Sequence, residues 1–193
     1  GLLINAPYYN RPSAEGVYRH IMAIVEATDL PVMIYDIPGR TGVRITDATL
    51  ARLAEHDRIL AVKDATGDVE QGFRRMEATG LEYYSGDDGL NFAWLAHGAS
   101  GVVSVVAHAD AHSWREMITE VDAGDLAGAR AVARRIRPLV QAIMGGGQGA
   151  VMAKEALLLQ GRIPSAALRL PLVRAEADEV AALRAVLDAS GLL

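Results

Sequence analysis

Short apolar runs alternate with longer segments of helical period along the first half of the chain. Five of these runs are expected to be strands: Leu2–Ala6, Val32–Ile37, Ile59–Val62, Leu81–Tyr84 and Val102–Ala107. Their starts lie 20 to 30 residues apart, which is the spacing of βα units around a parallel sheet. The pattern therefore predicts an α/β fold built on a parallel sheet.

Helices are predicted between the strands. Ala14–Thr28 carries apolar residues one helical turn apart, and Ser13 stands at the position of its N-cap. The same reasoning predicts three further helices: Asp47–His56, a helix from Asp68 to about Thr79, and one from Asp88 to about His97. Thr46, Asp68 and Asp88 are the expected capping residues.

The pattern changes after the fifth run, where no further strand appears. Four helices are predicted there, near residues 110–123, 126–144, 150–159 and 176–189. The pair Gly124-Asp125 ends one helix and caps the next, so it is the expected boundary between the two parts. The prediction is a strand-containing domain over residues 1–124 and a helical appendage over residues 125–193.

Composition narrows the class of protein. The chain has 193 residues, of which 51% are apolar and 22% are charged, enough to bury a core. Its net charge of −5 argues against nucleic acid as the main partner. The absence of cysteine excludes disulfides, thiolate nucleophiles and zinc–thiolate sites. No signal pattern and no run of about 18 apolar residues is present, so a cytoplasmic protein without a membrane partner is expected.

The most informative polar residue at a strand end is Lys63, which follows Leu60-Ala61-Val62 directly. Functional groups of parallel α/β folds gather at the carboxyl ends of the strands. Desolvation lowers the pKa of a lysine, and a partly neutral amine attacks carbonyl carbon to form a Schiff base. The alternative is a lysine at the strand end that forms an ion pair with Asp64 or Asp87.

Other strand ends offer weaker candidates. Tyr35 has the phenol needed for proton transfer, although from this residue alone a core tyrosine whose hydroxyl bonds to a backbone carbonyl is favoured. Arg40 carries a planar fork suited to a carboxylate, or it is a solvated arginine of a turn. Asp87 and Asp88 could orient a nucleophile, but capping of the following helix is the favoured interpretation.

Two further motifs carry little weight. His108-Ala-Asp110-Ala-His112 contains metal-binding residue types, but a surface or N-cap role is favoured over a metal site. The loop Gly145-Gly-Gly-Gln-Gly149 lacks the Lys-Ser/Thr pair of a phosphate-binding loop. Neither a metal nor a cofactor is expected.

Taken together, the strand ends resemble the dihydrodipicolinate synthase family of class I Schiff-base aldolases, within the N-acetylneuraminate lyase superfamily. The motifs that carry the resemblance are Pro7-Tyr-Tyr-Asn-Arg-Pro-Ser13, Tyr35-Asp-Ile-Pro-Gly-Arg-Thr-Gly42, Val62-Lys-Asp-Ala-Thr-Gly67, Ser85-Gly-Asp-Asp88 and Gly101-Val-Val-Ser-Val105. The resemblance covers the whole chain. It implies a (β/α)8 TIM barrel, here N-terminally incomplete with about five strands, followed by the helical appendage.

The resemblance also implies roles for individual residues. Lys63 would form the imine with pyruvate, and Tyr35 would move protons. Tyr9 looks like the family's second catalytic tyrosine, which reaches into the site of a neighbouring subunit. Arg40 would bind the carboxylate of L-aspartate 4-semialdehyde.

Three further positions follow from the same resemblance. Gly86 and Val103 match substrate-binding positions, and Tyr8 matches an interface position close to the lysine-feedback site of some members. The family implies a homotetramer built as a dimer of dimers.

The implied activity is the condensation of pyruvate with L-aspartate 4-semialdehyde in lysine and diaminopimelate biosynthesis. The main departure is the absence of the early strands and their Thr-Thr pair, since a complete barrel takes about 250 residues. Three alternatives stay open: a pyruvate-dependent aldolase or lyase for 2-keto-3-deoxy sugar acids or sialic acid, a truncated barrel without activity, and, least favoured, a metal-dependent aldolase. The Gly39-Arg40 turn favours the synthase over the lyase branch.

Overall fold

The computed structural model describes residues 1–146 and 148–193. These residues form two compact units, which comprise residues 1–103 and 104–193. The first unit contains the strands and the second is helical. Residue 147 of the glycine-rich loop lies outside the described residues. The phosphate-binding hypothesis for that loop includes this residue and therefore also falls outside the described part of the chain.

The first unit is built on a five-stranded parallel sheet, as the alternating pattern predicts. Its strands are β1 (Leu2–Asn5), β2 (Val32–Asp36), β3 (Ile59–Asp64), β4 (Glu82–Ser85) and β5 (Gly101–Val102). They follow one another in the sheet in chain order, β1-β2-β3-β4-β5, and every neighbouring pair is parallel. Sequential order of this kind is what successive βα units produce.

The fifth strand is shorter than the sequence predicts. Ser85 is the last residue of β4, and it pairs with Val102. The Val103 N–H donates to the Ser85 carbonyl at 2.8 Å. Because β4 ends at Ser85, the residues after Val103 have no strand residue of β4 with which to pair. The valine-rich continuation therefore leaves the sheet, and a 3-10 helix, η1 (Val106–His108), takes the place of the predicted strand residues.

The helices of the first unit match the predicted segments closely. They are α1 (Ala14–Glu26), α2 (Pro38–Thr41), α3 (Asp47–Ala54), α4 (Val69–Thr79) and α5 (Asn91–Ala96). The side chains of Ser13, Thr46 and Asp68 accept from backbone N–H groups of the first turns of α1, α3 and α4, which confirms these N-caps.

Two features of this unit differ from the predictions. The segment Pro38–Thr41, expected to be a turn, is one helical turn, which begins at a proline and ends at Gly42 with φ 76°. Asp88 does not cap α5, whose N-cap is Leu90. The Asp88 carboxylate instead accepts from the Asn91 side-chain amide at 3.1 Å.

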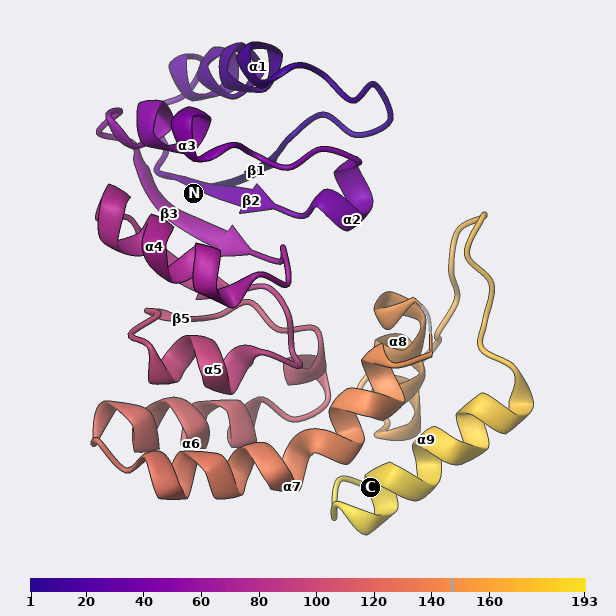
Figure 1. Cartoon of the computed structure of the whole chain (residues 1–193). Helices are drawn as coiled ribbons and strands as arrows, with labels where there is room; N and C mark the ends of the chain where they lie inside the picture. Colours follow the sequence, from indigo (N-terminus) through magenta and orange to yellow (C-terminus); the bar gives the residue numbers. More distant parts are fainter. Residues whose placement is uncertain (147) are drawn as a thin grey trace. The chain divides into compact units, whose positions relative to one another are not determined.

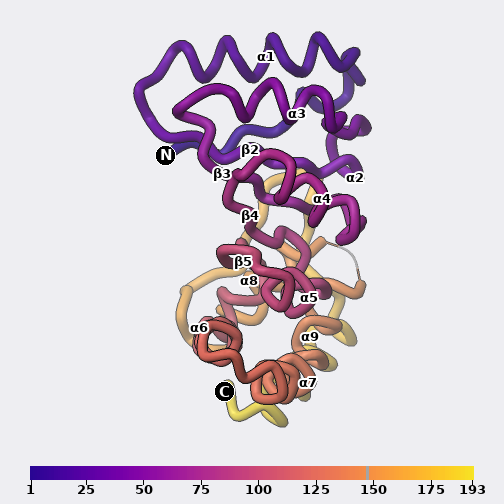
Figure 2. The backbone as a smooth tube through the Cα atoms, turned by 60° about the vertical axis from the view of Figure 1, so that its left-hand side comes forward, coloured from indigo at the N-terminus to yellow at the C-terminus, as the bar shows by residue number. Residues whose placement is uncertain are grey.

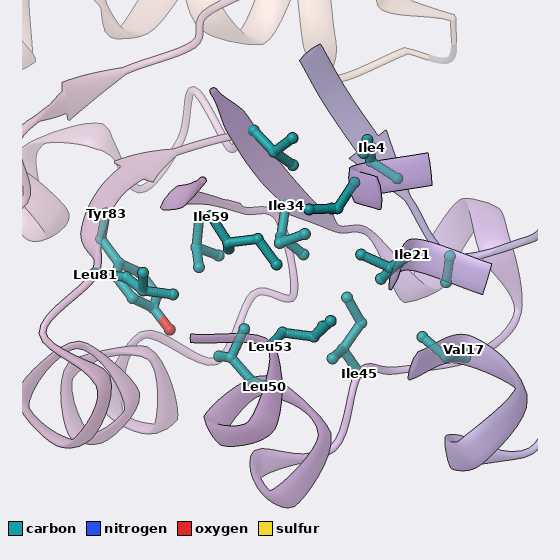
Figure 3. Close-up of a cluster of buried hydrophobic side chains, with 14 of the residues drawn as sticks. Ile4, Val17, Ile21, Ile34, Ile45, Leu50, Leu53, Ile59, Leu81 and Tyr83 are labelled. Carbon is teal, nitrogen blue, oxygen red and sulfur yellow. The ribbon is translucent and has the colours of Figure 1, made fainter. Parts of the chain in front are cut away.

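The hydrophobic core of the first unit lies between the sheet and its helices. Figures 1 and 2 show α1, α3 and α4 following one another beside strands β1 to β3. Ile34 of β2 and Ile59 of β3 point toward Leu53 of α3, and all three are almost fully buried (Figure 3). Burying one such side chain contributes about 1.5–3 kcal/mol to folding. On the opposite face of the sheet Leu3 and Leu60 are 50% and 51% exposed, so the described helices of this unit leave that face uncovered.

The second unit contains the remaining predicted helices. They are α6 (Ala111–Asp122), α7 (Leu126–Met144), α8 (Gly149–Leu159) and α9 (Ala177–Ala189). Gly124, with φ 79°, and the N-cap Asp125 join α6 to α7 inside this unit. The proposed assignment of residues 1–124 to a barrel and 125–193 to an appendage stays a prediction. No helix among the described residues has the length and apolar character needed to span a bilayer.

Candidate active site

Strand register brings five residues into one row across the sheet. The row consists of Asn5, Tyr35, Lys63, Tyr84 and Gly101, one from each strand. Successive side chains of a strand point to opposite faces. The residues that follow the three central members are buried on the helix-covered side: Asp36, Asp64 and Ser85. The row therefore lies on the face of the sheet that the helices of this unit leave uncovered.

Lys63 stands at the centre of this row and is half-buried. Its Nζ lies 3.9 Å from the centroid of the Tyr35 ring, a distance at which an ammonium and a ring attract. Burial lowers the pKa of the Lys63 amine, while the negative charge of Asp88 acts in the opposite direction. The net effect is an amine with a larger neutral, nucleophilic fraction than an ordinary lysine has.

The acidic residues considered as partners of Lys63 are engaged elsewhere. Asp64 lies on the other face of β3, where its Oδ1 accepts from the Thr66 N–H at 2.9 Å and from the Thr66 hydroxyl at 2.8 Å. Asp87 accepts from the Gly89 N–H at 3.0 Å. The ion-paired alternative for Lys63 with Asp64 or Asp87 is therefore not the arrangement in this structure.

Tyr35 and Arg40 are brought toward the same end of the sheet. Tyr35 is half-buried, and burial raises the pKa of its phenol, whereas the positive charge of Arg40 acts to lower it. Arg40 is exposed on α2, which follows β2 after a single residue. The phenol thus keeps its proton at neutral pH, with a guanidinium close enough to influence it.

Gly86 follows β4 and lies against the side chain of Lys63. A Cβ atom at this position would stand 2.9 Å from Lys63 Cε and 3.1 Å from the Asp64 carbonyl oxygen. The Gly86 N–H donates to that same carbonyl at 2.7 Å, so the backbone cannot withdraw without losing a hydrogen bond. A larger residue at this position would therefore displace the lysine side chain from the space that it occupies. Val103, the second predicted binding position, is the first residue after β5.

Tyr8 and Tyr9 do not belong to the strand row that contains Lys63 and Tyr35. They lie in the loop between β1 and α1 with 71% and 92% of their surfaces exposed. Tyr9 has φ 70°, an uncommon backbone conformation for a residue with a side chain. Their predicted roles at a subunit interface stay predictions.

Sequence reasoning missed Tyr84. It is half-buried beside Lys63 in the row, and its hydroxyl donates to the Glu82 carboxylate at 3.0 Å. The available signal was the alternation of β4, since Tyr83 is fully buried against the helices and its neighbour must face the other way.

For residues 108–112 a surface or N-cap role is favoured by the sequence over a metal site, and the N-cap role is confirmed for Asp110. The Asp110 side chain caps α6 by accepting from the Ser113 N–H at 3.1 Å. Within residues 1–146 and 148–193, no group of three His, Cys, Asp or Glu side chains is arranged to hold a metal ion.

The arrangement combines three chemical capacities at the carboxyl ends of neighbouring strands. An amine of lowered basicity can add to a carbonyl group, a protonated phenol can give and take protons, and a guanidinium can bind a carboxylate.

Comparison with known proteins gives the family. Residues 1–190 match the sequence model of the Dihydrodipicolinate synthetase family. A curated 4-hydroxy-tetrahydrodipicolinate synthase from Kineococcus radiotolerans is 50% identical over 192 residues, which cover 100% of this chain and 62% of that protein. The chain thus spans less than two thirds of the length of this relative.

Solved structures give the same result. Dihydrodipicolinate synthase from Thermotoga maritima matches with a TM-score of 0.95 and 39% identity, over 100% of this chain and 67% of that one. The enzyme from Acinetobacter baumannii, solved in complex with pyruvate, matches with a TM-score of 0.93 and 36% identity, over 99% and 66%. The predicted fold class, the strand-and-helix architecture of a TIM barrel with about five strands present, is confirmed.

Proposed function

The chain belongs to the dihydrodipicolinate synthetase family, and we propose that its site serves the condensation of pyruvate with L-aspartate 4-semialdehyde to 4-hydroxy-tetrahydrodipicolinate. The observation that carries the proposal is the position of Lys63, half-buried in the strand row with its amine 3.9 Å from the Tyr35 ring. The pyruvate bound to the Acinetobacter baumannii relative supports the choice of first substrate.

The proposed chemistry begins with the neutral Lys63 amine. It adds to the C2 carbonyl carbon of pyruvate, and loss of one water molecule leaves a protonated imine. This imine draws electrons from the adjacent methyl group, so a proton departs from that carbon and an enamine forms. The enamine carbon then forms a bond to the aldehyde carbon of aspartate semialdehyde, whose oxygen takes up a proton, and the imine to Lys63 re-forms. The amino group of the former semialdehyde attacks this imine carbon and closes the ring, and cleavage of the bond to Lys63 Nζ releases the cyclic product and the free amine.

Tyr35 and Arg40 supply the other functions of this reaction. The protonated Tyr35 phenol gives a proton to the departing hydroxyl and takes one back in later steps. Arg40 holds the carboxylate of the second substrate through paired N–H···O bonds, which fixes the aldehyde for attack. This grip is the feature that favours aspartate semialdehyde over the neutral hydroxyl-rich chain of a sugar acid.

The proposal extends to assembly and location. Tyr9 would act in the site of a neighbouring copy, and Tyr8 would line that interface, within a homotetramer that is a dimer of dimers. The 92% exposure of Tyr9 suits a side chain that finds its partner on another subunit. A cysteine-free chain suits the reducing cytoplasm.

Borohydride trapping tests the proposal, and the chain is well suited to it because Lys63 and Lys154 are its only two lysines. Incubation with pyruvate and borohydride should add the mass of one reduced imine to the peptide that holds Lys63. Lys154→Arg should trap pyruvate like the unchanged chain, and Lys63→Arg should not. Adduct on Lys154 or on the terminal amine alone, or none at all, would refute the assignment.

A further inference from the structure

Lys63 has an aromatic neighbour on each side in the strand row. Tyr35 on β2 and Tyr84 on β4 are both in register with it, and all three side chains project from the same face. Neighbouring strands lie about 4.8 Å apart, so side chains in register are within contact range. The amine lies over the Tyr35 ring on the β2 side, and Tyr84 is the register partner of the lysine on the β4 side.

Tyr84 is held in place from two directions. Its hydroxyl donates to Glu82 Oε2 at 3.0 Å, so the phenol points back along β4 toward the start of the strand. This hydrogen bond, followed by burial, raises the pKa of Tyr84, which keeps the hydroxyl a donor. On its far side the ring covers Gly101, where an added Cβ would stand 3.1 Å from both Cδ1 and Cε1.

The lysine side chain is confined on a third side as well. Gly86 leaves the space that Lys63 Cγ and Cε occupy, and a Cβ there would stand 3.0 Å and 2.9 Å from these two atoms. Gly86 thus lies close to the lysine stem, Tyr84 is its register partner on β4, and the amine itself lies over Tyr35.

From this geometry we propose that Tyr84 is a positioning residue for Lys63: its ring fills the β4 side of the lysine and keeps the amine over Tyr35. The inference rests on the proposed role of Lys63 as the reacting amine. Its physical basis is exclusion of water and of alternative side-chain rotamers, since a gap beside a flexible lysine would be filled by one or the other.

The electrostatic surroundings of the amine are defined by few groups. Tyr35 faces it from β2 and Tyr84 from β4, Asp88 acts on it from the segment after β4, and Arg40 acts on Tyr35. Removal of the Tyr84 ring changes none of these charges. It readmits water to the amine, which favours the protonated form.

The test compares Tyr84→Ala with Tyr84→Phe, which keeps the ring and loses only the bond to Glu82. The measurement is the pH dependence of reductive methylation of Lys63 by formaldehyde and cyanoborohydride, read by peptide mass spectrometry with Lys154 as the internal reference. Tyr84→Ala should move the Lys63 midpoint to higher pH by about one unit and slow pyruvate trapping at neutral pH about tenfold. Tyr84→Phe should restore both.

Two results would overturn the inference. One is an unchanged Lys63 midpoint and trapping rate in Tyr84→Ala. The other is equal impairment of Tyr84→Phe, which would assign the effect to the hydroxyl. If Tyr84→Ala does not fold, Tyr84→Val, a better strand former, replaces it with the same expected shift. Tyr18→Ala, a tyrosine on α1 beneath Arg52, is the matched control and should leave the midpoint unchanged.

The methylation profile also separates this inference from the proposed function, because it involves no pyruvate. A chain in which Lys63 never traps pyruvate refutes the condensation, while the response of the Lys63 midpoint to the Tyr84 variants still decides whether the ring positions the lysine.

Discussion

Arg75 of α4 donates through Nη1 to Asp36 Oδ2 at 3.1 Å, and both side chains are buried behind the strand that carries Tyr35. The other two nitrogens of the guanidinium donate as well: Nη2 to the Ile45 carbonyl and Nε to Asp47, both at 2.6 Å. The site-bearing end of β2 is therefore fixed from the helix side of the sheet.

Replacement of this arginine should be costly. Arg75→Met leaves the Asp36 carboxylate buried without its ionic partner and should lower the free energy of unfolding by ~3–5 kcal/mol. Urea denaturation followed by circular dichroism measures this loss. Arg74→Met is the matched control, because Arg74 pairs with Glu70 on the exposed surface of the same helix and should contribute less than about 1 kcal/mol. Equal losses in the two variants would contradict the account.

The buried carboxylate of Asp64 predicts a pH dependence of stability. Burial raises the pKa of Asp64 despite its hydrogen bonds from Thr66, and its Oδ2 has no hydrogen-bond partner among the described residues. A raised pKa in the folded state means that the folded chain holds this proton more tightly than the unfolded chain does. The contribution of Asp64 to stability is therefore most favourable below the unfolded pKa of about 3.9 and declines as pH rises toward the folded pKa.

Asp64→Asn isolates this contribution because it cannot ionise. The difference in free energy of unfolding, unchanged chain minus variant, should fall as pH increases from about 4 to 7. Denaturation at several pH values measures it. A difference that stays constant or rises over this range is incompatible with a raised pKa.

Gly86→Ala should impair the lysine more than the fold. The added Cβ would stand 2.9 Å from Lys63 Cε, so the side chain must move away from its place over Tyr35. Overpacking of this kind costs about 1–3 kcal/mol, and pyruvate trapping should slow by about tenfold or more. Gly89→Ala, whose Cβ would meet only an Asp87 oxygen at 3.4 Å, is the control from the same segment. Similar trapping rates in both variants would argue against this close approach.

Arg40→Ala separates the two substrates. Pyruvate trapping at Lys63 should continue, while turnover of aspartate semialdehyde should fall by about 10- to 100-fold, the equivalent of ~1.5–3 kcal/mol for hydrogen bonds to a charged group. Arg44→Ala removes a nearby arginine that bonds to Gln71 and should have little effect on either measurement. Loss of trapping in Arg40→Ala would assign the arginine to the first substrate instead.

Sequence patterns were sufficient for the sheet and for most helix ends. Strand alternation, acidic or hydroxyl N-caps and the Gly-Asp pair are local signals, and the structure follows them at Ser13, Thr46, Asp68 and Asp125. The fifth strand was overestimated because its length depends on where β4 ends, which is information from another part of the chain.

The site was predictable only in part, for a related reason. Lys63 is visible in sequence as a charge that ends an apolar run. Tyr84 and Arg75 are not, since a tyrosine in a strand and an arginine in a helix are ordinary residues until register and burial are known. Their relevant neighbours are 21 and 39 positions away: Lys63 is in register with Tyr84, and Asp36 accepts a hydrogen bond from Arg75.

The sequential strand order makes the spacing of the row independent of the lengths of the connecting segments. Each member of the row from Asn5 to Gly101 is placed by the hydrogen bonds between its strand and the neighbouring strands. The number of residues in the connecting segments therefore does not affect its position in the row. An insertion between α1 and β2 would lengthen the periphery without shifting Tyr35 relative to Lys63. The connecting segments can therefore change in length while Tyr35, Lys63 and Tyr84 keep the spacing that the sheet register sets.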